Sequence, residues 1–197
     1  MAQEVTVLMW GQGYPGLDRI PYYGGLDDMV EGISGNLPGE YMVHVLVSSC
    51  GKEGVVYRPK KNVLVYGSPA IPFAAGEDYA PFYLPLGREC DKFTAETLDS
   101  GVWALKNILP EVIDGSETPV VSHVHDYSSG PLGRDLKKCG VPFVYHVHLS
   151  IDRRAIDPYY SNCHDLRQFY EKLACEESDM VIAVSEDTKN SLLNAYD

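Results

Sequence analysis

The sequence PVVSHVHDYSSGPLGRDLKKCGVPFVYHVHLS (residues 119–150) contains the pattern that decides the fold. Residues 119–124 and 141–148 are short apolar runs of the kind that form buried strands, and residues 130–139 between them have a helical pattern. Gly140 directly after the helical stretch is typical of a helix end. A strand, a helix and a second strand in this order predict two parallel strands joined by a helical crossover.

The same alternation extends over most of the chain. We expect further strands over residues 5–10, 41–48 and 180–184. We expect further helices over residues 26–34, 91–109, 165–177 and 186–196. Residues 51–85 are rich in Gly, Pro and Tyr and predict loops or an irregular sheet edge, with short β runs at 55–58 and 62–66. The sequence therefore predicts one α/β domain over residues 1–197, a Rossmann-like, doubly wound, mostly parallel sheet with helices on both faces.

Composition excludes several classes of function. The 197 residues are 45% hydrophobic and 22% charged, as in ordinary globular proteins, and the formal net charge is −12. Nucleic acids and anionic membranes need clustered Lys and Arg, so neither is an expected partner. No apolar run approaches the roughly 20 residues of a membrane span, and the acidic N-terminus does not resemble a signal peptide. The five cysteines form no CxxC pair, which indicates reduced thiols and a cytoplasmic protein.

Four polar or glycine-rich clusters follow predicted strands. They are residues 10–25, residues 123–126, residues 146–148 and Ser185. In an open α/β sheet, ligands bind outside the carboxyl ends of the strands. We therefore expect these clusters to converge on one edge of the sheet and to form a binding site there.

The first cluster contains five glycines, Gly11, Gly13, Gly16, Gly24 and Gly25, before a predicted helix. Glycines let a backbone approach a ligand closely, and a helix N-terminus offers free N–H groups to an anion. The spacing is not GxGxxG and the gap is too long for a dinucleotide turn, so we expect no NAD site. Glycines that serve only as turns are the alternative.

The second and third clusters carry two His-x-His pairs, His123 with His125 and His146 with His148. Because side chains alternate along a strand, each pair points to one face of the sheet. Four imidazoles would suit zinc, whereas the alternative is that one histidine of each pair packs against a helix and the other forms hydrogen bonds. Carboxylates are scarce at the other strand ends, apart from Asp126 and Asp152, and we expect no resident metal.

Three stretches carry a resemblance to a known family. They are WGQGYPGLDRIPYYGGLDDMVEGI (residues 10–33), SHVHDYSSGPLGRDLKKCGVPFVYHVH (residues 122–148) and EKLACEESDMVIAVSEDTKNSLLNAY (residues 171–196). In this order and spacing they resemble the N-terminal domain of retaining GT-B glycosyltransferases, the group that includes glycogen and starch synthases. The resemblance covers nearly the whole chain and is weakest over residues 51–85.

The resemblance implies half of a GT-B fold. In such enzymes the N-terminal Rossmann-like domain mostly holds the acceptor, and a C-terminal domain with a Glu-x7-Glu motif binds most of the nucleotide-sugar. The chain matches the first domain only, so we expect it to need a donor-binding domain in cis or in trans and to be inactive alone. The implied donor is UDP-glucose or ADP-glucose, the acceptor is a glucan or another carbohydrate, and no cofactor is implied.

The resemblance also assigns roles to individual residues. The resemblance implies catalytic roles for His125, which would contact the transferred sugar, and for Asp28 on the first helix. Substrate-binding roles pass to Gly24 and Gly25 near the donor diphosphate, His148 in the acceptor-side wall, Asp126 and Ser185. Two alternatives to a glycosyltransferase remain. One is a non-catalytic α/β domain that binds sugar or regulates, and the other is a metal-dependent hydrolase that uses the two His-x-His pairs.

Overall fold

The fold is built on one seven-stranded sheet with the strand order β3-β4-β2-β1-β5-β6-β7. The computed structural model describes residues 5–11, 25–47, 54–69, 92–151 and 164–196. Neighbouring strands are parallel except for the antiparallel pair β3 and β4 at one edge. The strands are β1 (Val5–Gly11), β2 (Tyr41–Val47), β3 (Val55–Lys60), β4 (Val63–Gly67), β5 (Val120–His125), β6 (Phe143–Val147) and β7 (Met180–Ala183).

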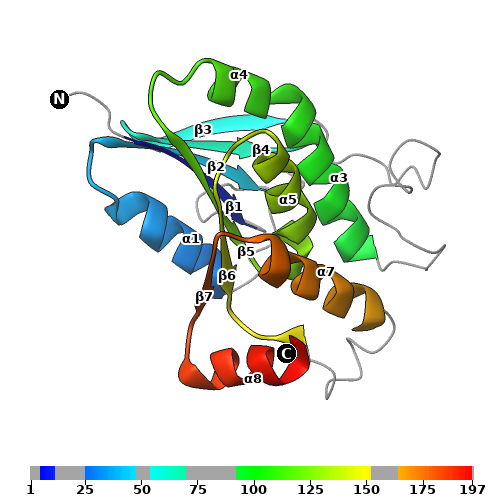
Figure 1. Cartoon of the computed structure of the whole chain (residues 1–197). Helices are drawn as coiled ribbons and strands as arrows, with labels where there is room; N and C mark the ends of the chain where they lie inside the picture. Colours follow the sequence, from blue (N-terminus) through cyan, green and yellow to red (C-terminus); the bar gives the residue numbers. More distant parts are fainter. Residues whose placement is uncertain (1–4, 12–24, 48–53, 70–91, 152–163, 197) are drawn as a thin grey trace.

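Helices cover both faces of this sheet, as the sequence predicts. The helices are α1 (Gly25–Asn36), α3 (Lys92–Asn107), α4 (Leu109–Asp114), η1 (Tyr127–Ser129), α5 (Gly130–Lys138), α7 (His164–Glu177) and α8 (Glu186–Tyr196). Figure 1 shows α1 on one face of the sheet and α3, α5 and α7 on the other. This arrangement confirms the doubly wound α/β architecture.

Alternation along the central strands divides the core into two layers. On β1, Val7 and Met9 pack in the cluster that contains Val30 of α1. Leu8 and Trp10 point the other way, into the larger cluster beneath α3, α5 and α7. A strand that is apolar on both faces must lie inside a sheet with helices on each side, so β1 takes the central position.

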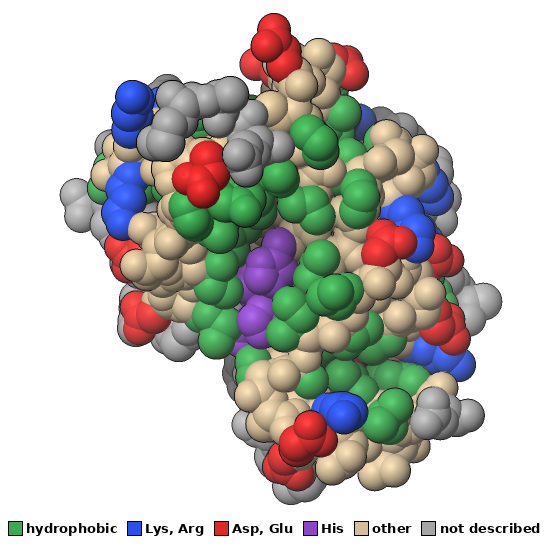
Figure 2. All heavy atoms as spheres, turned by 60° about the vertical axis from the view of Figure 1, so that its left-hand side comes forward, with side chains coloured by type: hydrophobic (Ala, Val, Ile, Leu, Met, Phe, Trp, Pro, Cys, Tyr) green, Lys and Arg blue, Asp and Glu red, His purple; other side chains and the backbone are tan. Residues whose placement is uncertain are grey.

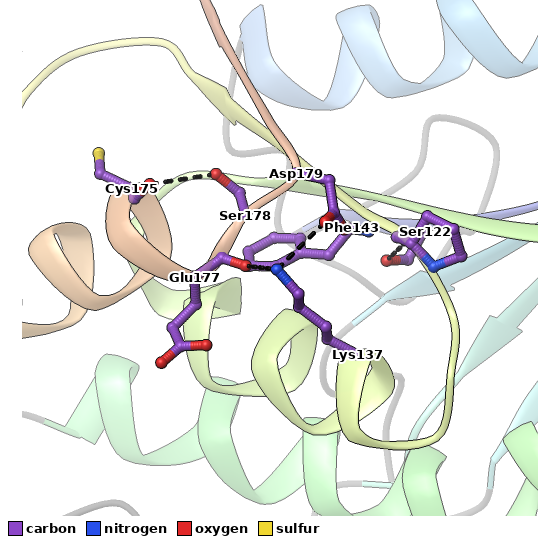
Figure 3. A network of polar contacts seen from close by, with 8 residues as sticks. Ser122, Lys137, Phe143, Cys175, Glu177, Ser178 and Asp179 are labelled. Carbon is purple, nitrogen blue, oxygen red and sulfur yellow. Dashed lines mark hydrogen bonds and ion pairs between the residues drawn. The ribbon is translucent and has the colours of Figure 1, made fainter.

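The amino-terminal ends of β6 and β7 are tied to the helices beside them by a polar network (Figure 3). The carboxylate of Asp179 accepts a hydrogen bond from the backbone N–H of Phe143 at 2.9 Å and pairs with Lys137 Nζ at 3.1 Å. Lys137 Nζ also donates to the backbone oxygen of Glu177 at 2.6 Å. The last turn of α5, the end of α7 and the start of two strands are thereby held together.

The predicted boundaries agree with the structure to within two residues, and one helix differs in that the chain breaks it near its predicted end. The helix predicted over residues 91–109 ends at Asn107, and a separate helix begins at Leu109. Pro110 explains the break, because proline has no N–H to donate to the preceding turn. Residues 51–85 were predicted to form loops or an irregular sheet edge, and their described part contains the β3–β4 pair, whose register shifts between Tyr57 and Lys60. Residues 51–53 and 70–85 lie outside the described residues. Within the described part of the chain, no helix is both long enough and apolar enough to cross a membrane.

Candidate functional site: a histidine cluster at the carboxyl ends of β5 and β6

Four histidines meet where β5 and β6 end. The parallel register pairs His125 with His146, so both His-x-His pairs lie on the same face of the sheet. Nε2 of His123 lies 3.1 Å from Nδ1 of His146, and Nδ1 of His125 lies 3.0 Å from Nε2 of His148. Neighbouring ring centroids are 4.5 to 5.2 Å apart. We call His123, His125, His146 and His148 the histidine cluster.

Burial lowers the pKa of three imidazoles of the cluster, those of His123, His125 and His146, and so keeps these rings neutral. Burial, with a smaller contribution from the neighbouring histidines, lowers the pKa of His123 and of His146 to about 4. Asp126 acts in the opposite direction on His146, but its effect is smaller than that of burial. The side chain of His125 is 1% exposed, and burial lowers its pKa well below 6.5. Neutral imidazoles have one donor and one acceptor nitrogen each, so the cluster can bind hydroxyl groups or a metal ion.

His125 has an unused polar atom. Its Nδ1 is engaged by His148, whereas its Nε2 is buried and has no hydrogen-bond partner among the residues that the structure describes. Buried polar atoms in proteins are nearly always hydrogen-bonded, and one without a partner calls for an explanation. A ligand that reaches Nε2 would supply the missing contact.

Asp126 shapes the chain directly after β5. Its φ is +58°, which makes it the only residue other than glycine with a positive φ in the described segments. Its backbone N–H donates to the oxygen of His146 at 2.9 Å, and its Oδ1 accepts from the N–H of His148 at 3.2 Å. Ser129 donates to the backbone oxygens of His125 and Asp126. Asp126 therefore fixes the end of β6 against the end of β5, which is a positioning role.

The cluster is reached from outside through a hollow. Figure 2 shows histidine side chains together in this hollow, with hydrophobic side chains around them. The strand register places Val144, Met180 and Ile182 on the same face as the cluster. A hollow with an apolar rim and a few polar groups at its centre is the usual form of a small-molecule site.

The structure brings only part of the predicted site together. Direct contacts join His125, His148 and Asp126, as expected from their place at the carboxyl edge. Gly25 is the first residue of α1 and Asp28 is exposed on the same helix, at the edge reached from the end of β1. Gly24, like most of the segment 10–25, lies outside the described residues.

Ser185 has a local structural function. Its Oγ accepts a hydrogen bond from the N–H of Thr188 at 3.1 Å, which confirms the predicted N-cap of α8. Its surroundings are a different hollow, of about 520 Å³, which Cys175, Leu192 and Tyr196 also line. A substrate contact for Ser185 stays a prediction.

His123 and His146 are the members of the cluster to which the resemblance assigned no role. The sequence pattern that could have identified them is their spacing, since each lies two residues before His125 or His148. The spacing alone did not show that the rings would touch across the strands, because the register of β5 against β6 decides that contact.

Comparison with known proteins agrees with this architecture. The family model Glycosyltransferase Family 4 matches residues 99–197, half of the chain, including β5, β6, β7 and the whole histidine cluster. The chain belongs to this family. No curated protein sequence matches it.

Solved structures with the same fold cover the rest of the chain. The chain is similar to an α,α-trehalose-phosphate synthase (UDP-forming) from Burkholderia xenovorans in complex with glucose-6-phosphate, with a TM-score of 0.57, 15% identity and 97% of the chain covered. For the corresponding enzyme from Burkholderia vietnamiensis these values are 0.54, 17% and 98%. For a trehalose-6-phosphate protein from E. coli bound with UDP-2-fluoro glucose they are 0.50, 13% and 96%.

These similarities show the fold of an N-terminal GT-B domain. The chain spans 43% of the Burkholderia vietnamiensis protein and 42% of the other two. The glycosyltransferase family and the GT-B fold predicted from the sequence are therefore confirmed. The narrower resemblance to glycogen and starch synthases stays a prediction, because these neighbours are named for trehalose phosphate.

Proposed function

We propose that the chain is the acceptor-side domain of a retaining glycosyltransferase that moves a hexose, with glucose as our first choice, from a nucleotide-sugar to a carbohydrate. Activity would then require a donor-binding domain in cis or in trans. The observation that carries this proposal is the histidine cluster at the carboxyl ends of β5 and β6, inside the segment matched by the family model. The E. coli neighbour bound with UDP-2-fluoro glucose supports UDP-glucose as the donor, with ADP-glucose as the alternative.

His125 is the residue to which we assign contact with the transferred sugar. Its neutral ring and its Nε2 atom, buried without a partner among the described residues, suit a hydrogen bond to a sugar hydroxyl. His148 holds Nδ1 of the same ring and so fixes its orientation. A fixed dipole of this kind stabilises charge that develops in the transition state without reorganising.

The charges of the molecule indicate how the proposed transfer reaction would stabilise the leaving diphosphate. Charge builds on the departing diphosphate, and the N-terminus of α1 at Gly25, with Gly24 before it, offers backbone N–H groups to it. The net charge of −12 indicates that the main phosphate-binding cations come from the donor-binding domain. In our proposal the leaving phosphate accepts the proton of the acceptor hydroxyl on the same side of the sugar. Asp28 and Asp126 would act by placing groups near this reaction.

The test is transfer from UDP-glucose by the chain joined to its donor-binding domain. We expect His125→Ala to lower the rate at least about 100-fold, because an interaction worth about 2.7 kcal/mol in the transition state is removed. His44→Gln is the matched control, since His44 is also a half-buried neutral histidine but bonds Tyr66 away from the cluster. A His125→Ala enzyme within about threefold of the control would overturn the role given to His125.

The acceptor is identified by calorimetry on the chain itself. Maltooligosaccharides test the glucan acceptor implied by the sequence, and glucose-6-phosphate tests the acceptor suggested by the Burkholderia xenovorans neighbour. Saturable binding of one of them, with a weak response to UDP-glucose alone, is the result expected of an acceptor-side domain. Binding of sugar without transfer beside a donor-binding domain would favour the non-catalytic alternative.

A further inference from the structure

Helix α7 carries two charged residues that the fold buries almost completely. Arg167 is 5% exposed and Glu171 is 1% exposed, and they lie one turn apart on the buried side of the helix. Arg and Glu are rarely buried to this extent unless they have partners, because removing a charge from water is costly. We propose that Arg167 and Glu171 are positioning residues, which hold the chain directly after β5 and β6 and thereby orient the histidine cluster. The consequence for sugar transfer rests on the proposed function, whereas the orientation of the rings does not.

Glu171 holds the segment that follows β6. Both of its carboxylate oxygens accept the backbone N–H of Ile151, each at 3.0 Å from the nitrogen. The hydroxyl of Tyr196 in α8 donates to Oε2 of the same carboxylate at 2.7 Å. Both partners are donors, which suits the ionised form of Glu171, because that form only accepts hydrogen bonds. Hydrogen bonds to an ionised group are stronger than neutral ones, so this anchor is a firm one.

The anchored segment includes the outermost ring of the cluster. Ile151 comes three residues after His148, whose backbone N–H donates to Asp126 at 3.2 Å. The ring of His148 in turn contacts Nδ1 of His125 through its Nε2, at 3.0 Å. A displacement of the segment after β6 would therefore change the contact that fixes the ring of His125.

Arg167 holds the segment that follows β5. Its guanidinium carbon lies 5.6 Å from the centre of the Tyr127 ring, which is a cation–π contact. Tyr127 is 1% exposed and begins η1, the first element after β5. The backbones are close here as well, since a Cβ atom on Gly130 would lie 2.9 Å from the backbone oxygen of Tyr170 and from Cβ of Ala174. A larger residue than glycine would thus push α7 away from the chain that leaves β5.

The two buried charges therefore act on the two segments that continue from the histidine pairs. A charge that only stabilised the fold could be replaced by an apolar side chain of similar volume, often without loss of stability. A small displacement of a reacting group, in contrast, lowers the rate of a reaction strongly. Retention of both charges at this edge of the sheet favours positioning over stability alone.

The first measurement is nitrogen NMR of the imidazole rings in the isolated chain, which shows whether each ring nitrogen donates or accepts. We expect Glu171→Ala to change the signals of His125 and His148, because the segment after β6 loses its anchor. Lys172→Ala is the matched control on the same helix, since Lys172 is exposed and pairs with Glu176 at 3.7 Å. It should leave the ring signals unchanged. Unchanged ring signals in Glu171→Ala would overturn the proposal, whatever the activity of the variant.

The second measurement is transfer from UDP-glucose by the chain joined to its donor-binding domain. Glu171→Ala should lower kcat by about 10- to 100-fold and change KM for the acceptor by less than about threefold, because misplaced rings act on the transition state. Glu171→Gln keeps an oxygen acceptor and the shape of the side chain, so it should recover much of the loss. A kcat of Glu171→Ala equal to that of Lys172→Ala would overturn the positioning role in transfer.

Failure of this proposal and failure of the proposed function give different results. If the rings respond to Glu171→Ala but His125→Ala retains transfer, the positioning is correct and the role of His125 in transfer is wrong. If His125→Ala loses transfer while Glu171→Ala matches its control in ring signals and kcat, the role of His125 stands and the positioning proposal is wrong.

Two further variants complete the test. Arg167→Met keeps most of the side chain without its charge, and it should change the signals of His125 more than those of His148, because its contact lies after β5. Tyr196→Phe removes only one hydroxyl group from Glu171 and replaces Glu171→Ala if that variant does not fold. We expect it to cause a smaller change in the signals of His148. No response of the rings to either variant would overturn the proposal.

Discussion

The two ends of strands β5, β6 and β7 differ in how their polar groups are satisfied. At the amino-terminal end, Asp179 and Lys137 have side chains that are 47% and 39% exposed, and the contacts of Figure 3 pair them with each other and with the backbone. At the carboxyl end, His125 is 1% exposed, its Nε2 has no hydrogen-bond partner within the described part of the chain, and Asp126 is held at a φ of +58°. The polar groups at the amino-terminal end are therefore paired and stabilise the fold. Those at the carboxyl end include an unsatisfied atom and a strained residue, which lower the free energy of unfolding.

This difference separates structural from functional polar groups. Strained backbone and unsatisfied buried atoms persist only where the surrounding structure imposes them, and they concentrate at binding and catalytic sites. Both features occur at the carboxyl end of β5, the edge where open α/β sheets bind ligands. Burial, hydrogen bonding and backbone conformation therefore agree on the location of the site.

Acidification should have the largest effect on stability, and it should act through the carboxyl end. The folded chain holds the pKa of His123, His146 and also His44 near 4, below the usual 6.5. The unfolded chain takes up protons first, so this stability is complete above about pH 6.5 and is lost as the pH falls toward 4. Each such histidine adds up to about 1.4 kcal/mol per pH unit to the slope of the free energy of unfolding.

Urea denaturation between pH 7 and pH 4.5 measures this slope, and a double variant His123→Gln with His146→Gln should flatten it. The amino-terminal end titrates in another window. Hydrogen bonding by Phe143 and Lys137 lowers the pKa of Asp179 below 3.8, so its contribution is lost only at still lower pH. A free energy of unfolding that stays constant from pH 7 to pH 4.5 would show that the buried histidines are not held neutral.

Removal of the Asp126 side chain should have the next largest effect. Asp126→Ala leaves the N–H of His148 without its acceptor and forces an alanine to adopt a φ of +58°. We expect a loss of about 1–3 kcal/mol in the free energy of unfolding. Asp126→Asn keeps an oxygen acceptor and the size and shape of the side chain, so it should lose less than about 1 kcal/mol. Equal losses for the two variants in urea denaturation would contradict the positioning role.

Disruption of the amino-terminal network should have the smallest effect. Lys137→Met keeps the alkyl chain but removes the pair with Asp179 and the hydrogen bond to Glu177. Exposed pairs contribute little, and we expect a loss below about 1 kcal/mol that decreases further at high salt. Lys138→Met is the control, because Lys138 pairs with Asp135 in its own helix. If Lys137→Met lowered the free energy of unfolding by more than Asp126→Ala does, the contrast between the two ends of the strands would be reversed.

Most of the fold could be predicted from local pattern. Apolar runs and helix-end residues predicted the bounds of β5, α5 and β6 within a few residues. Gly140, with a φ of +82°, follows the end of α5 as expected. The break at Ile108 was missed, because the apolar stripe of the predicted helix includes Leu109, which in the structure begins the next helix. The β3–β4 edge was predicted only as irregular, since its register depends on pairing with β2.

The candidate site could be predicted in its members but not in its contacts. The two His-x-His pairs and their common edge follow from a side-chain period of two and from parallel strands. The conformation of Asp126 has no sequence signal, because its ψ of 170° lies outside the left-handed helical region that Asp tolerates. The sequence also left open whether one histidine of each pair would pack against a helix, and in the structure the pairs contact each other instead.

The sequence by itself determined the order of strands and helices, the polar residues at their ends and the family to which the chain belongs. Only the tertiary structure decided that His123 meets His146, that His148 holds His125, and that Nε2 of His125 is buried with no hydrogen-bond partner among the described residues. The physical reason is that periodicity is a local property of the chain, whereas the contacts between rings depend on the register of two strands. Burial then depends on everything packed around those rings, and burial sets their charge and therefore their chemistry.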